Sequence, residues 1–116
     1  MRYLILIYVD PATYAGVSEA EQQAEMAEYY ALGPSFRERG WDVSGEALQA
    51  IDTATTVRQR DGKFLVTDGP FAETKEHLGG YYLVDCANLD EALEFARSVP
   101  DVRRGSIEVR PVAVYD

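Results

Sequence analysis

Two short segments that are apolar at both odd and even positions constrain the fold of this chain most. Tyr3 to Val9 contains no charged residue, and Gly80 to Asp85 encloses the run Tyr-Tyr-Leu-Val. Strands of this kind are covered on both faces, so each is expected in the middle of a sheet. Both are far shorter than the roughly 18 apolar residues that cross a bilayer. We therefore expect two central strands and no membrane-spanning segment.

Helical signals separate the predicted strands. Ser18 and Glu21 form a capping box, and the alanines behind it recur at helical spacing. At Gly33-Pro34 we expect this helix to kink or break, because proline removes a backbone donor and crowds the preceding turn. A second helix is expected over residues 89–99, where one stripe is apolar and Pro100 stops the chain.

A β-hairpin is the strongest local prediction. Asp61-Gly62 is a type I′ turn pair between residues 55–60 and residues 63–67. A two-residue loop sets Val57 opposite Val66, and it places the basic side chains of the hairpin on the other face. Weaker strand patterns cover residues 41–49 and 107–115, the latter with Pro111 at a sheet edge.

This order of elements predicts the fold class. Two β-α-β halves form a ferredoxin-like α+β sandwich, an antiparallel sheet with two helices on one face. The length of 116 residues fits one domain, residues 1–116. Because the central strands are apolar on both faces, we expect a second copy to cover the bare face. The sequence therefore predicts a homodimer.

Composition excludes several classes of function. Twenty acidic residues face eleven Lys and Arg, a net charge of −9, which argues against nucleic acid and against an anionic membrane surface as partners. The single cysteine, Cys86, is expected to be an inert core thiol and indicates a reducing compartment. No secretory cleavage pattern follows the first strand, so we expect a cytoplasmic protein. No cofactor fingerprint is present, and one His without a Cys pair predicts no metal site.

The segment between the hairpin and the second apolar strand carries the densest chemistry. Residues 67–80 hold three carboxylates, an amine and the only imidazole of the chain. A helical turn over residues 72–77 would make Glu73 and His77 neighbours, and Phe71 would fix the loop as an apolar plug. A structural, solvated loop is the alternative, since Asp-Gly-Pro is a common turn.

On the functional interpretation this loop borders a site for a small polar or anionic molecule. The candidate catalytic residues are Asp68, Glu73 and His77. The candidate ligand-binding residues are Asp68, Gly69, Pro70, Phe71, Lys75 and Glu76. Carboxylates and an imidazole suit acid–base chemistry, and Lys75 would meet an anionic oxygen.

The run Asp68-Gly-Pro-Phe-Ala-Glu-Thr-Lys-Glu76 resembles the signature of the YCII-related proteins of the bacterial DGPF type. The resemblance extends over nearly the whole chain and implies a dimeric α+β barrel. Some members of the wider group have a His/Asp active site with the His in the first helix, where this chain has Tyr29-Tyr30, so that pair is not carried over.

Two functions follow from these expectations. The first is a homodimeric small-molecule-binding protein, in which an acid–base activity is an open question. The alternative is a non-catalytic regulatory protein acting with an extracytoplasmic-function sigma factor, because genes of the signature type often lie beside such factors.

Overall fold

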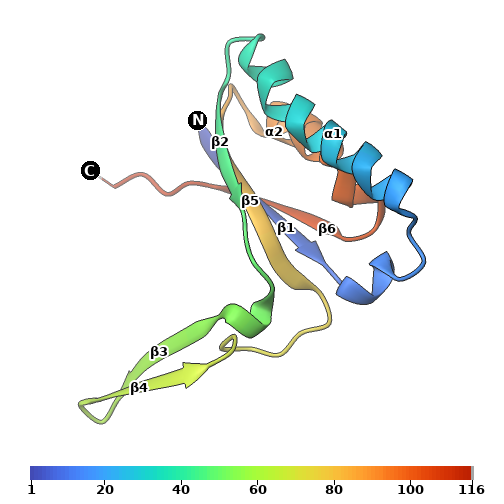
Figure 1. Cartoon of the computed structure of the whole chain (residues 1–116). Coiled ribbons are helices and arrows are strands. Elements are labelled where there is room, and N and C mark those ends of the chain that lie inside the picture. Colours follow the sequence, from blue (N-terminus) through green and yellow to red (C-terminus); the bar gives the residue numbers. More distant parts are fainter. Residues whose placement is uncertain (116) are drawn as a thin grey trace.

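The computed structural model describes residues 1–115, so Asp116, the last residue of the predicted domain, lies outside the described residues. Figure 1 shows the order of the elements along the chain. The strands are β1 (Arg2–Val9), β2 (Asp42–Ala47), β3 (Thr55–Arg60), β4 (Lys63–Asp68), β5 (His77–Asp85) and β6 (Ser106–Pro111). The helices are α1 (Glu19–Arg37), α2 (Leu89–Arg97) and the short 3-10 helices η1 (Pro11–Tyr14), η2 (Ile51–Thr53) and η3 (Pro100–Arg103).

The main sheet confirms the predicted fold class. Its strand order is β2-β5-β1-β6, and every neighbouring pair is antiparallel. The two doubly apolar segments are the central strands β1 and β5, as expected, and the Pro111 strand is an edge. This is the ferredoxin-like order, with the β3–β4 hairpin inserted between β2 and β5. No helix within residues 1–115 is long and apolar enough to cross a membrane.

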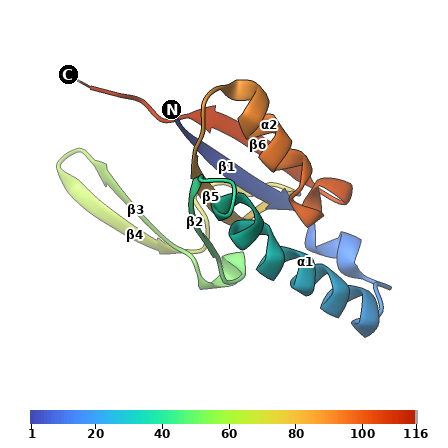
Figure 2. The same ribbon diagram turned by 90° about the horizontal axis from the view of Figure 1, so that it is seen from above.

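Both helices lie on one face of the sheet (Figures 1 and 2). The core between the layers contains Ile5, Val84, Phe95 and Val99, all without solvent exposure. Aromatic rings fill its wider end: the Phe95 ring lies 4.8 Å from Phe36 and 5.1 Å from Tyr82 between centroids. Aromatic pairs at such distances add to the apolar area that the core removes from water. The single thiol, Cys86, is buried at the rim of this core, as expected.

The opposite face of the sheet is apolar but uncovered in the single chain. Along β1 the side chains of Tyr3, Ile5 and Ile7 are buried beneath the helices, while those of Leu4, Leu6 and Tyr8 are only half-buried. In the register with β5, Leu4 pairs with Leu83 and Leu6 with Tyr81, so these side chains form one continuous apolar surface. We call these five residues the bare sheet face.

The predicted break at Gly33-Pro34 is wrong, because α1 continues through Pro34 to Arg37. Leu32 and Phe36 are the side chains that bury α1 in the core, and their packing outweighs the hydrogen bond that Pro34 cannot donate. Gly33 leaves room for the Arg37 guanidinium, which donates to the Val43 carbonyl at 2.9 Å and 3.1 Å. The alanine-rich N-terminal part of α1 remains exposed.

The hairpin is confirmed in type and in register. Asp61 and Gly62 have φ of 53° and 74°, the two positive values that a type I′ turn needs. Val57 lies opposite Val66, and Arg60 opposite Lys63. The last strand is shorter than predicted: it ends at Pro111, so residues 112–115 lie outside the sheet.

Candidate functional site

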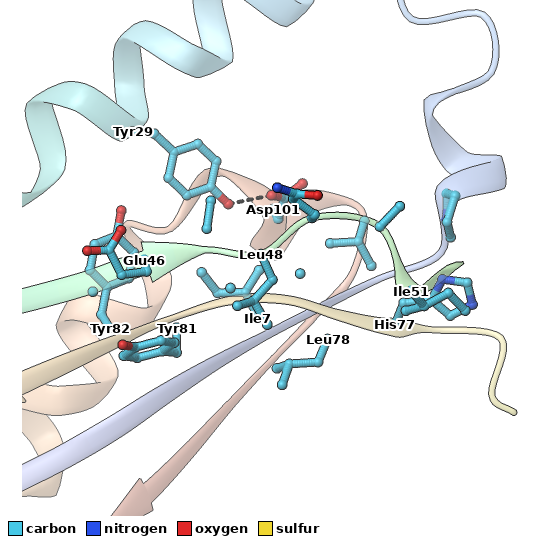
Figure 3. A pocket seen from close by; sticks show the side chains of 18 of the residues that line it. Ile7, Tyr29, Glu46, Leu48, Ile51, His77, Leu78, Tyr81, Tyr82 and Asp101 are labelled. Atoms are coloured by element: carbon cyan, nitrogen blue, oxygen red, sulfur yellow. Dashed lines mark hydrogen bonds between the residues drawn. The ribbon is translucent and has the colours of Figure 1, made fainter. Parts of the chain in front are cut away.

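A cleft of about 800 Å³ lies between the N-terminal part of α1 and one end of the sheet. Its walls are mostly apolar: Met26 and Tyr29 come from α1, Ile7 from β1, and Leu48 from the segment that follows β2 (Figure 3). A cleft of this size is within the range that small-molecule ligands occupy in proteins.

The cleft contains one buried carboxylate. Asp101 is 7% exposed, and its two oxygens accept hydrogen bonds from two tyrosine hydroxyls. Tyr14 donates to Oδ1 and Tyr29 donates to Oδ2 (the Tyr29 bond is dashed in Figure 3). These bonds join residues that are 87 and 72 positions apart in sequence. A buried charge is tolerated where it is hydrogen-bonded in this way.

Two short 3-10 helices position Tyr14 and Asp101. Tyr14 ends η1, which Asp10 begins by accepting from the Ala12 amide at 2.9 Å. Asp101 lies in η3, where Pro100 occupies the first turn and the Gly105 amide donates to the Asp101 carbonyl at 2.7 Å. Proline at a helix start needs no hydrogen-bond partner for its nitrogen, so it suits this position. Both turns are thus specified locally.

Ion pairs then hold η3 against α1. Arg103 Nη2 lies 2.7 Å from Glu28 Oε2, and Arg104 pairs with Glu25. The Arg104 guanidinium also lies over the ring of Tyr14, 5.2 Å from its centroid. Cation–π contact at this distance favours one orientation of the ring. These ion pairs and the cation–π contact therefore help to hold Tyr14, Asp101 and Tyr29 in position.

The two hydroxyls are held as donors. Burial, together with the hydrogen bond to Asp101, raises the pKa of Tyr14 above its ordinary value. The same two causes, burial first, raise the pKa of Tyr29. Neither phenol ionises near neutral pH, so the carboxylate always faces two O–H groups. We call Tyr14, Tyr29 and Asp101 the buried triad.

The lining of the cleft is acidic. Besides Asp101 it includes the carboxylates of Glu46 and Asp52, whereas none of its lining residues is Lys or Arg. His77 lies beside Ile51, at the end of the cleft where the chain enters the hairpin (Figure 3). Such a surface attracts hydrogen-bond donors and cations rather than anions.

Most of the residues predicted as a site lie outside this cleft. Asp68, Glu73 and Lys75 are exposed and are not part of its lining, whereas His77 lines it. Gly69 and Pro70 are half-buried at the turn that follows β4. The structure thus places one of the predicted catalytic residues, His77, at the cleft. The other two, Asp68 and Glu73, lie in the segment of residues 68–76, which we call the signature loop.

Two local expectations for this loop are wrong. Residues 72–76 are bends and irregular chain rather than a helical turn, so helical spacing does not bring Glu73 to His77. Phe71 is 76% exposed and plugs nothing within the chain, because the loop passes over the surface. Glu76 instead accepts from the Ser106 hydroxyl, with its two oxygens at 3.0 Å and 3.2 Å.

The sequence did not single out Asp101 or Tyr14, and it drew attention to Tyr29 only because Tyr29-Tyr30 stands where some related proteins have a His. Asp101 follows Pro100 in the first turn of the short helix η3, where an acidic residue is common and carries no special meaning. Only the tertiary contacts distinguish it. Within residues 1–115, no three His, Cys, Asp or Glu side chains gather as metal ligands would.

Comparison with known proteins gives the family. The YCII-related domain matches residues 1–116. An uncharacterised protein of Rhizobium meliloti (strain 1021) is 42% identical over 117 residues, covering 99% of this chain and 94% of the relative. A match over the full length at this identity leaves one conclusion: the chain belongs to the YCII-related domain family.

Proposed function

We propose that this protein binds a small molecule in the cleft beside the buried triad. The observation that supports it is the Asp101 carboxylate, which is buried at the wall of an apolar cavity of about 800 Å³. A carboxylate in such a place costs free energy unless it is hydrogen-bonded, and it then offers its remaining lone pairs to a ligand. Apolar walls with one oriented polar group are typical of ligand sites.

The ligand chemistry follows from the same lining. The apolar walls accept a hydrophobic body, and the buried Asp101 carboxylate favours a cationic or hydrogen-bond-donating end group, with weaker negative charge from the exposed Glu46 and Asp52. This differs from the anionic ligand that Lys75 suggested, because Lys75 does not reach the lining. The proposed ligand is therefore an apolar molecule with an amine or, more weakly, a hydroxyl group.

Three compounds with one carbon skeleton test this proposal. Phenethylamine, 2-phenylethanol and 3-phenylpropanoate share an aryl-alkyl body and differ in the end group. At a concentration of ten Kd, a ligand stabilises by about 1.4 kcal/mol. With an unfolding entropy of about 0.24 kcal/mol/K for a chain of this length, this raises the melting temperature by about 6 °C. The amine should bind best and the carboxylate worst.

Two variants distinguish binding inside the cleft from binding elsewhere on the protein surface. Asp101→Asn should remove most of the preference for the amine over the alcohol, as measured by calorimetry on folded protein. Asp52→Asn, at the exposed rim, should keep most of it. Equal affinities for all three compounds, or tightest binding of 3-phenylpropanoate, would contradict the proposal.

We also propose that the protein is a homodimer joined through the bare sheet face. Leu6 and Tyr81 lie at the centre of this face and are half-buried in the single chain. An apolar sheet surface of this kind is typical of an interface, and the stacked arrangement agrees with the α+β barrel that the resemblance implies. Size exclusion with light scattering should give twice the chain mass at micromolar concentration, whereas a monomer would contradict it.

A regulatory role with a sigma factor has less support from the structure. It would use the acidic residues of α1 to meet a basic partner. Two of these, Glu25 and Glu28, are already paired with Arg104 and Arg103 within the chain. Charge reversal of Glu19 and Glu21, which are exposed, should abolish capture of the neighbouring sigma factor if this alternative holds.

An acid–base activity stays a prediction for His77, the candidate catalytic residue that lines the cleft. It lies at the far end of the cavity from Glu46, so it would act on a ligand that extends along the whole cleft. Asp68 and Glu73 would take part only with a ligand that also contacts the surface of the signature loop.

A further inference from the structure

The β3–β4 hairpin stands apart from the rest of the chain. Its two strands pair only with each other, and Figures 1 and 2 both show it pointing away from the two helices. The radius of gyration is 16.5 Å, against about 13 Å for a compact chain of this length. The hairpin is therefore an arm rather than part of the globular body.

This arm exposes apolar side chains. Val57, Phe64 and Val66 share one face, and Phe64 and Val66 are 72% and 66% exposed. The signature loop that follows adds Phe71, whose ring is also largely exposed. A two-stranded hairpin alone in water is marginally stable at best. An arm of this composition gains stability when its apolar face is covered.

The signature loop is attached to the base of the arm. The Gly69 amide donates to the Ala54 carbonyl at 2.7 Å, and the Thr56 hydroxyl donates to the Gly69 carbonyl at 2.8 Å. Arg58 Nη2 donates to the Phe71 carbonyl at 3.0 Å. Gly69 has a φ of 95°, which favours glycine at this turn. Phe71 is therefore held beside β3 with its ring in solvent.

We propose that the hairpin and the first residues of the signature loop, together residues 55–71, form a docking arm that packs against a second copy of this chain. Phe64, Val66 and Phe71 are its apolar anchors. The signature then specifies an interface rather than a catalytic loop. The inference rests on the proposed homodimer and adds a second contact region to it, since the bare sheet face does not include the arm.

The exposed area supports a second copy as the occupant. The chain exposes 8170 Å², whereas a folded monomer of 12.9 kDa exposes about 6,300 Å². The excess is more than twice the roughly 800 Å² per partner that a stable interface buries. The exposed apolar side chains of the arm contribute to this excess, and aromatic anchors such as Phe64 and Phe71 are the side chains that dominate interfaces.

Charge favours the same occupant. Arg58, Arg60 and Lys63 lie on the face of the hairpin opposite Phe64 and Val66, in a chain whose net charge is −9. Two copies of an acidic protein repel each other least where basic side chains gather. The arm can therefore approach a second copy without the repulsion that two acidic helices would meet.

Two matched variants in the same strand test the arm. Val66→Lys changes the apolar face, and Leu65→Lys makes the same change on the opposite face, where Leu65 is 47% exposed. Sedimentation velocity over a dilution series should show at least a tenfold rise in the dimer Kd for Val66→Lys and less than threefold for Leu65→Lys. Phe71→Ala should also weaken the dimer. Equal effects of the two lysine variants, or none, would overturn the docking arm.

A third variant distinguishes failure of the docking-arm proposal from failure of the homodimer proposal. Leu6→Lys changes the bare sheet face at its centre and should give a monomer whose circular dichroism is that of the folded chain. If Leu6→Lys dissociates the dimer while Val66→Lys and Phe71→Ala do not, only the arm is refuted. If the unaltered chain is a monomer at high concentration, the homodimer fails as well, and the arm does not bind a second copy.

Discussion

Replacing Asp101 by Asn should destabilise the protein by about 1.5 kcal/mol. In the structure the carboxylate accepts one hydrogen bond from Tyr14 and one from Tyr29. Hydrogen bonds to a charged group contribute about 1.5–3 kcal/mol each, and the low end applies because both hydroxyls border a cleft that admits water. The amide keeps one acceptor oxygen and replaces the other by a donor. One of the two bonds is therefore lost, without a change in volume.

The assay is thermal and urea unfolding of a double-mutant cycle. With about 0.24 kcal/mol of unfolding free energy per degree, Asp101→Asn should lower the melting temperature by about 6 °C. Tyr29→Phe should cost a similar amount. The double variant should cost less than the sum by about 1 kcal/mol, because both single variants remove the same contact. Asp52→Asn, on the exposed rim, should change stability by less than about 0.5 kcal/mol.

Two results would refute this reasoning. Strict additivity would show that Tyr29 and Asp101 do not interact. A rise in melting temperature for Asp101→Asn would show that desolvation of the carboxylate outweighs its two hydrogen bonds, the balance found for some buried charges. In that second case the carboxylate would be retained at a cost in stability, which is common for ligand-binding groups.

Three further predictions follow from other parts of the structure. The raised pKa values of Tyr14 and Tyr29 stabilise the folded state at pH below about 10, the ordinary tyrosine value, and this contribution is lost as pH rises through the higher folded values. Tyrosinate absorbance should therefore show these two phenols ionising late, and the double Phe variant should lose two late-ionising phenols, whereas Tyr82, whose pKa burial also raises, remains. Phe95→Ala, at a fully buried ring, should lower the urea unfolding free energy by about 3–5 kcal/mol. Gly45→Ala should destabilise strongly by melting temperature, since its Cβ would lie 2.3 Å from the Tyr81 carbonyl oxygen.

Features set by local interactions could be predicted from the sequence. The capping box at Ser18 is present, with its hydroxyl accepting from the Glu21 amide at 3.1 Å. The Asp61-Gly62 turn has the expected backbone, and its register follows from loop length alone. The central position of the two doubly apolar strands also follows from local pattern. Together these determine the ferredoxin-like arrangement.

Features that depend on a balance between local backbone preference and tertiary packing could not be predicted from the sequence. Pro34 is a local helix breaker, yet α1 continues because the residues on either side of it, Leu32 and Phe36, are buried in the core. Phe71 is apolar and lies between two strands, which favours burial, yet the arm carries it away from the only core of the described chain. In both cases the deciding interaction involves an element distant in sequence.

The candidate site shows the same limit most clearly. Asp101 is one of twenty acidic residues, and nothing in its sequence neighbours distinguishes it from the others. Its burial depends on η1, α1 and η3 meeting at one place, where Arg103 and Arg104 also pair with acidic residues of α1. The signature segment, by contrast, is conspicuous because many polar residue types are crowded into a short run. Such crowding is what a solvent-exposed connection at the base of an arm needs, since its backbone groups are satisfied by nearby side chains and water. Density of polar residues therefore located the connection at the base of the arm, while the buried carboxylate could be found only from the geometry of two short turns and one helix.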